Sequence, residues 1–128
     1  SIIQGRAGVM PAFGHLSSAQ LSEVAAYVRN LANLPADDLK VAQGESVFKT
    51  NCVACHGGDG KGNIILGAPN LTDKVWLYGS SEKAVTETIQ KGRNGVMPSH
   101  EAILTPEKIQ ILTAYVWGLS HQPMSIKK

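Results

Sequence analysis

Two cysteines and a histidine within five positions, Cys52, Cys55 and His56, are the residues best suited to chemistry. On a helix or tight turn, residues three apart project on the same side. Two thiols so placed can add to the two vinyl groups of one haem, while the next residue sets an imidazole beneath the iron. The spacing C-x-x-C-H therefore predicts one covalently bound haem c, with His56 as an iron ligand.

Other uses of C-x-x-C have to be weighed against this one. Redox dithiols use the same spacing, and so does half of many zinc sites. A zinc site needs about four ligands, yet the sequence has no second cysteine pair and offers only His15, His100 and His121 besides. A dithiol oxidoreductase would have a βαβ pattern nearby, which is absent. A non-haem thiol or metal-binding domain is kept as a remote alternative.

Met97 is the candidate for the sixth iron ligand. It lies 41 residues after His56, in a glycine-rich loop that ends at Pro98. Glycines let such a loop approach a flat macrocycle, and proline fixes the backbone beyond the sulfur. A methionine is more often core filler, but this one does not lie on an apolar helical stripe. Imidazole and thioether together raise the reduction potential and leave no open position for a substrate, as suits an electron carrier.

The chain contains an internal repeat. GRAGVMP at 5–11 recurs as GRNGVMP at 92–98; Met10 precedes Met97 by 87 positions, and Tyr27 precedes Tyr115 by 88. A repeat of this length indicates two copies of one domain. We predict the end of a first cytochrome domain at 1–34, a linker at 35–38, a complete haem domain at 39–122 and a tail at 123–128.

Both cysteines belong to the second copy, so Met10 is left without a haem of its own. We expect Met97 to bind the iron in preference to Met10. The reason is that Met97 should share a compact domain with His56, whereas Met10 must arrive across the 35–38 linker.

Caps and periodicity predict a helical chain. Ser17 followed by Gln20 is a capping-box pattern at the start of a helix over about 18–32. Further helices are expected at 41–51, at 81–91 and from about 105 onward, with irregular loop over 57–70. No segment alternates convincingly as a strand does, and the predicted fold class is all-α.

Composition excludes several other roles. The chain has 128 residues and a net charge of +2, too little to indicate nucleic acid or an anionic membrane surface as partner. Aromatic residues make up only 5%, so a large apolar cofactor would help to fill a core. No apolar run approaches the roughly 20 residues that span a bilayer, and the N-terminus lacks signal-peptide features. We expect a soluble chain that reaches a membrane only through an upstream anchor or through partner subunits.

The sequence resembles a known family. C-x-x-C-H followed by M-P is similar to the class I cytochrome c fold, preceded here by the end of a second, truncated cytochrome c domain. The closer resemblance is to the di-haem subunit of the cbb3-type cytochrome c oxidases, carried by AQGESVFKTNCVACHGGDGKGNIILGAPNLTDKVWLYGS, GRNGVMP and GRAGVMPAFG. That family subunit also has an N-terminal membrane helix and a first C-x-x-C-H, which this sequence lacks.

The resemblance implies roles for further residues. Pro69 would accept a hydrogen bond from the outer ring nitrogen of His56, and Trp76 and Arg93 would contact the haem propionates. It also implies a helix crossing made by three structural residues of the first and last helices of the haem domain, namely Gly44, Phe48 and Tyr115.

The resemblance further implies the function. The chain would relay electrons from a donor cytochrome c to the haem-copper catalytic subunit, on the periplasmic side of the bacterial inner membrane. It has no copper-ligand histidine cluster, so it is not expected to be an enzyme on its own. The alternative within this class is a free or dehydrogenase-associated di-haem cytochrome c.

Overall fold

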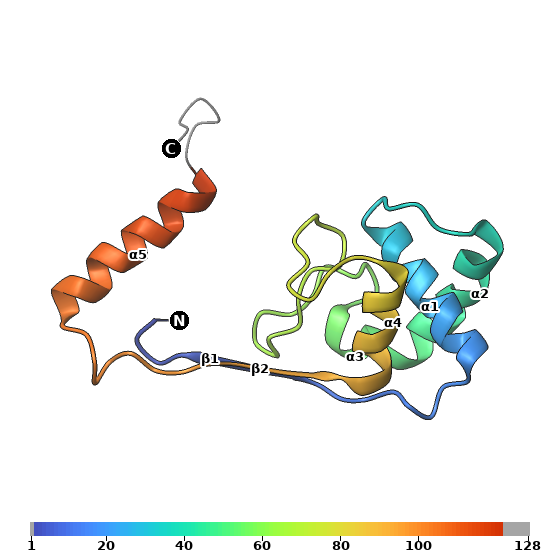
Figure 1. Cartoon of the computed structure of the whole chain (residues 1–128), viewed down its shortest axis with the longest axis horizontal. Helices are drawn as coiled ribbons and strands as arrows, with labels where there is room; N and C mark the ends of the chain where they lie inside the picture. Colours follow the sequence, from blue (N-terminus) through green and yellow to red (C-terminus); the bar gives the residue numbers. More distant parts are fainter. Residues whose placement is uncertain (1, 122–128) are drawn as a thin grey trace. The chain divides into compact units, whose positions relative to one another are not determined.

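The computed structural model describes residues 2–121, which fall into two compact units. The larger unit is Gly8–Gly95; the smaller one contains the described residues 2–7 and 96–121. Helices dominate both units (Figure 1). The predicted tail at 123–128 lies outside the described residues. Within the described part, no helix is long and apolar enough to cross a membrane.

The first helix, α1 (Ser18–Leu31), confirms the predicted capping box. The Ser17 hydroxyl accepts from the Gln20 amide, and the Gln20 side chain accepts from the Ser17 amide in return. Two of the helix's unpaired N-terminal donors are thereby satisfied. The helical period then places its apolar residues on one buried face, which consists of Leu21, Val24, Ala25, Ala26 and Val28.

Helix α2 (Asp38–Asn51) packs along α1. It starts three residues before the predicted position, because the Asp37 carboxylate accepts from the amides of Leu39 and Lys40 and so caps the helix. The predicted 35–38 linker thus ends in a helix cap. Where the two helices cross, a Cβ on Gly44 would collide with the Glu23 carbonyl, so only glycine permits this approach.

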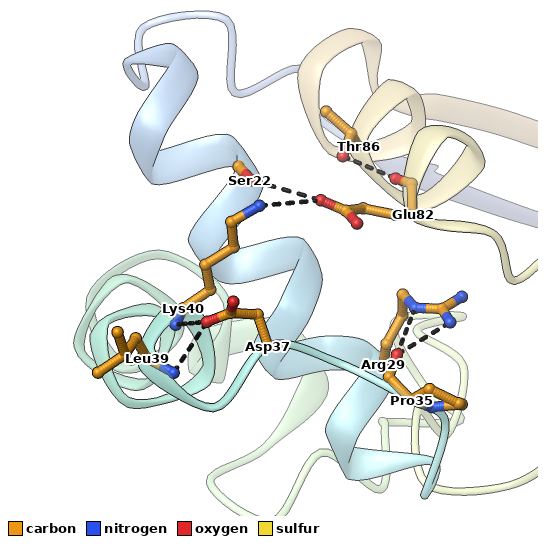
Figure 2. Close-up of polar contacts among 8 residues, drawn as sticks. All are labelled: Ser22, Arg29, Pro35, Asp37, Leu39, Lys40, Glu82 and Thr86. Carbon is orange, nitrogen blue, oxygen red and sulfur yellow. Dashed lines mark hydrogen bonds and ion pairs between the residues drawn. The ribbon is translucent and has the colours of Figure 1, made fainter.

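Helix α4 (Glu82–Lys91) completes the core of the larger unit, capped by Ser81. The core is built from all three helices and the motif cysteine, and consists of Leu16, Leu21, Val24, Ala25, Val28, Val47, Phe48, Cys52, Val85 and Ile89. Figure 2 shows polar contacts at its edge, where the Glu82 carboxylate accepts from Ser22 of α1 at 3.4 Å and pairs with Lys40 of α2 at 3.5 Å. These contacts are exposed, so the apolar core carries most of the stability.

The prediction of an all-α fold was wrong in one respect. Strands β1 (Arg6–Met10) and β2 (Arg93–Met97) pair in a two-stranded sheet. They are the two copies of the repeated GVMP motif, each expected as an irregular loop. Neither strand has a continuous alternating pattern, and only the pairing between the copies makes them regular.

Helix α5 (Pro106–His121) belongs to the smaller unit. It forms in the region predicted, but none of its residues is buried. Its large apolar side chains are exposed, among them Ile111, Leu112, Tyr115, Val116, Trp117 and Leu119.

The two compact units divide the chain at other positions than the predicted domains do. Segments 8–34 and 39–91 lie in the larger unit, and segment 96–121 lies in the other. Side chains of α1 contribute to the core of the larger unit. The division into the end of a first domain at 1–34 and a haem domain at 39–122 stays a prediction.

Candidate haem site

The motif cysteines lie on a helical turn, α3 (Val53–His56), which follows α2 almost without a break. The Cys52 amide donates to the Phe48 carbonyl at 2.8 Å, and the His56 amide donates to the Cys52 carbonyl at 2.9 Å. Helical geometry sets Cys52 and Cys55 about one turn apart along the same side. The local backbone is the one expected for C-x-x-C-H.

The two cysteines are both free thiols, but their surroundings differ. Cys52 is buried in the core, and Cys55 is exposed. Burial raises the pKa of the Cys52 thiol from its ordinary 9.0 to about 11, with a smaller contribution from nearby Cys55. At neutral pH Cys52 is a protonated thiol that behaves as a small apolar side chain.

His56 is buried and its orientation is fixed. Its ring Nδ1 lies 3.1 Å from the Pro69 carbonyl oxygen. A carbonyl can only accept, so Nδ1 carries the proton and donates, which leaves Nε2 as the ring atom with a lone pair. Pro69 lies in the loop after the motif. This loop is bonded back to α3, because the Gly62 amide donates to the His56 carbonyl at 2.8 Å. This is the arrangement that orients an imidazole for a metal.

Trp76 and Arg93 have different environments. The indole Nε1 of Trp76 is buried without a hydrogen-bond partner among the described residues. A buried, unpaired donor is costly and uncommon, so this atom is suited to an acceptor from a bound group. Arg93 instead donates from Nε and Nη2 to the Thr88 hydroxyl at 3.1 and 3.0 Å, and its guanidinium stacks 4.1 Å from the centre of the Tyr78 ring.

The two repeated methionines have different surroundings. Met97 lies in the smaller unit with 39% of its surface exposed. Met10 lies in the larger unit, partly buried against the core cluster that contains Cys52. Met97 therefore falls in a different unit from His56, and its role as an iron ligand stays a prediction.

Gly44 and Phe48 of α2 make a close helix crossing within the larger unit, where they contact Tyr27 of α1. Tyr115, the partner that the resemblance implied, lies on α5 in the other unit, and its part in a crossing stays a prediction. Tyr27 occupies in the first copy of the repeat the position that Tyr115 occupies in the second.

The residues of the larger unit fit a covalently bound haem. The chain offers two thiols on one helical turn, an oriented imidazole beside them and an unpaired buried N–H at Trp76. Exposed apolar side chains follow the motif in the loop before α4, namely Ile64, Ile65, Leu66, Val75 and Leu77. Across residues 2–121, no group of three or more His, Cys, Asp or Glu side chains could hold a metal ion.

Comparison with known proteins places the chain among subunits of cytochrome c oxidases. Residues 39–116 match the family model for cytochrome c oxidase, cbb3-type, subunit III. The chain is 52% identical over 116 residues to the cbb3-type cytochrome c oxidase subunit FixP of Bradyrhizobium diazoefficiens, covering 88% of this chain and 40% of the relative. It is 44% identical over 119 residues to subunit CcoP of Cereibacter sphaeroides, covering 91% of this chain and 41% of the relative.

Helical packing around C-x-x-C-H, together with the family match, defines a c-type cytochrome domain. Cytochromes of this class carry haem c as their prosthetic group. More specifically, the chain belongs to the subunit III family of cbb3-type cytochrome c oxidases. It spans about two fifths of the length of the curated relatives it matches.

Proposed function

We propose that this chain binds one haem c and relays single electrons within a cbb3-type oxidase. The observation that carries the proposal is the buried His56, held by the Pro69 carbonyl directly after two thiols on one helical turn. The haem supplies an iron that changes between two oxidation states by one electron. The chain's own residues attach it, hold it and control access to it.

Attachment is assigned to Cys52 and Cys55. Each thiol would form a thioether with one vinyl group of the haem, the S–H hydrogen going to the other vinyl carbon, so that no oxidant is needed. Cys55 is exposed and accessible, whereas Cys52 already lies in the core. Two thioether links from a short helical turn would hold the macrocycle in one orientation.

Nε2 of His56 and the sulfur of Met97 would hold the haem iron. The Pro69 carbonyl keeps the proton on Nδ1, which fixes the ring and makes Nε2 a better donor. A thioether ligand from Met97 would favour the reduced iron. Trp76 Nε1 is assigned to a haem propionate, and Arg93 to the same region through the nitrogen not bonded to Thr88.

Electron exchange needs a short-lived contact at the haem edge. Ile64, Ile65 and Leu66 are exposed in the loop that follows the motif and would provide an apolar docking surface. The net charge of +2 is small, so long-range steering would be modest.

In this proposal, a donor cytochrome c delivers the electron and the haem-copper catalytic subunit of the same complex receives it. Both partners act on the periplasmic side of the bacterial inner membrane. The family to which the chain belongs supports this assignment. The chain itself is an electron-transfer subunit, and oxygen reduction is assigned to its partner.

The decisive experiment is visible spectroscopy of the chain matured with haem. We expect the sharp reduced bands of a low-spin c-type haem and a pigment that stays attached on denaturation. The matched variant Cys52→Ala with Cys55→Ala should lose covalent attachment. A colourless protein from a host that matures other c-type cytochromes would contradict the proposal.

A further inference from the structure

Arg93 is held by a hydroxyl group and an aromatic ring. Its Nε and Nη2 donate to the Thr88 hydroxyl at 3.1 and 3.0 Å, and its guanidinium lies 4.1 Å from the centre of the Tyr78 ring. All three residues belong to the larger unit. Within the part of the chain that the structure describes, no carboxylate pairs with Arg93. The side chain therefore carries an uncompensated positive charge in a defined position.

The two contacts restrain different parts of the guanidinium. Thr88 bonds one edge and uses two of the five N–H donors, so the others are left for an acceptor outside the described residues. Tyr78 covers one face, as a planar guanidinium allows. A long side chain held at both edge and face has lost rotamer freedom before any ligand arrives. Arg93 is thus preorganised for a carboxylate.

The turn that leads into α4 sets the position of Tyr78. Gly79 has φ +99°, in the region that favours glycine, so the chain turns directly after the tyrosine. Arg29 of α1 donates to the Ser80 carbonyl, and the Ser81 hydroxyl caps α4. The backbone after Tyr78 is therefore bonded to both α1 and α4, and the ring position is a consequence of the fold.

The pair of Tyr78 and Arg93 lies outside the apolar core of the larger unit. Tyr78 is 43% exposed, so its ring is not a buried core side chain. Gly95 leaves room for its hydroxyl group, because a Cβ there would lie 3.3 Å from the phenol oxygen. Core packing does not account for the stacked arrangement, and its removal should leave the fold intact.

The same short segment contains the other donor assigned to the haem. Trp76 lies two residues before Tyr78, packs against the core cluster and has a buried Nε1 without a partner among the described residues. Trp76 thus supplies a neutral N–H, and Tyr78 holds a cationic one on Arg93. A haem propionate is a carboxylate, which accepts from both kinds of donor.

We propose that Tyr78 is a positioning residue of the haem site, whose ring holds the Arg93 guanidinium ready for a haem propionate and thereby raises the reduction potential. The inference rests on the proposed function, because it concerns the haem bound there. A positive charge next to a propionate compensates its negative charge, which favours the reduced iron. Tyr78 acts only through Arg93.

The test is a double-mutant cycle on the reduction potential of the haem-loaded full chain. Tyr78→Leu removes the aromatic face but keeps an apolar side chain, so the potential should fall. Arg93→Gln should lower the potential at least as far. In the Arg93→Gln background, Tyr78→Leu should cause no further fall, because no guanidinium is left to hold. An equal fall in both backgrounds would mean that Tyr78 acts through packing, and would overturn the proposal.

Two matched controls separate the ring from its hydroxyl and the contact from the charge. Tyr78→Phe keeps the aromatic face, so it should restore the potential that Tyr78→Leu lowers. Lys91→Gln also removes one positive charge, from a side chain that pairs with Glu87 at 3.5 Å on the exposed surface of α4. It should lower the potential less than Arg93→Gln does. Equal falls would assign the effect to long-range charge and would overturn the proposal.

Arg93→Lys tests the same contact without altering Tyr78. Lysine keeps the charge but lacks the planar fork that stacks on the ring and bonds a carboxylate, so the potential should still fall. An unchanged potential would overturn the proposal. The free energy of unfolding provides a second readout, in which Tyr78→Leu and Arg93→Gln should be less than additive because each removes the same stack. Additive losses would mean that the two side chains do not interact.

The visible spectrum distinguishes failure of this inference from failure of the proposed function. A chain that takes up no haem contradicts the proposed function, and the inference fails with it. A chain with the bands of a low-spin c-type haem, in which Tyr78→Leu leaves the reduction potential unchanged, overturns the inference alone.

Discussion

The ring of Tyr27 lies against the ring of Phe48, with centroids 5.0 Å apart and planes tilted by 47°. Tilted aromatic pairs at this separation stabilise a contact beyond the area they bury. Phe48 is 1% exposed and begins the last turn before the motif cysteine. The packing of α1 therefore supports the end of α2, directly before the C-x-x-C-H turn, through this aromatic pair among other core contacts.

The helix crossing should depend on Gly44. In Gly44→Ala the new methyl would meet the Glu23 carbonyl and lie 2.9 Å from the Tyr27 Cβ, so the helices must separate. We expect a loss of roughly 1–3 kcal/mol in the free energy of unfolding, the usual cost of overpacking. Chemical denaturation followed by circular dichroism measures it.

The control for this substitution is Gly118→Ala on α5. An added methyl there meets nothing within 4 Å. Alanine is the better helix former by about 1 kcal/mol, so this variant should be neutral or slightly more stable. Equal destabilisation by both variants would mean that the crossing at Gly44 is not specific.

The two cysteines should differ in reactivity in the haem-free chain. Cys52 has its pKa raised to about 11 by burial and is shielded, whereas Cys55 is exposed. Since the thiolate is the nucleophile, iodoacetamide at neutral pH should label Cys55 first. Mass spectrometry of tryptic peptides gives the order, and faster labelling of Cys52 would contradict the burial seen here.

The same pKa shift makes stability depend on pH. Folding raises the Cys52 pKa from 9.0 to about 11, so the folded chain holds the proton more tightly than the unfolded chain does. This contribution is fully present below pH 9 and is lost as the pH rises towards 11. Cys52→Ala should flatten the loss of stability over that range in the haem-free chain, and an unchanged profile would argue against the shift.

Trp76→Phe tests the unpaired indole donor. If Nε1 bonds a propionate, its removal leaves that negative charge less compensated, which favours the oxidised iron. We expect a lower reduction potential with the visible spectrum unchanged. Trp117→Phe is the matched control, since that indole is 63% exposed on α5. Equal shifts of the reduction potential in the two variants would show that Trp76 does not contact the haem.

Ile65 should contribute to docking with electron partners. It is 94% exposed in the loop after the motif, so Ile65→Ser should slow electron transfer from a small cytochrome c without altering stability. The matched control is Leu39→Ser on α2, where the side chain is 78% exposed. Stopped-flow rates should also depend only modestly on ionic strength, and a steep fall with salt would indicate a docking surface dominated by charge pairs.

Much of the local structure could be predicted because local interactions determine it. Ser17 with Gln20 starts α1, Ser81 starts α4, and C-x-x-C-H lies on a helical turn. Each of these features depends on residues within about one turn of each other. The two strands could not be predicted, because their pairing joins segments almost 90 positions apart and neither segment alternates clearly.

The sequence by itself determined a mainly helical chain with C-x-x-C-H on a helical turn, because these features depend on neighbouring residues. The contact of His56 with Pro69 was implied by a resemblance, and it is present in the structure. The sequence could not determine which helix closes the larger unit. Tyr27 and Tyr115 stand at equivalent positions on equally apolar faces, so pattern alone supports either. Only tertiary packing decided between them, since Gly44 and Phe48 can accommodate one helix at a time, and in this structure that helix is α1.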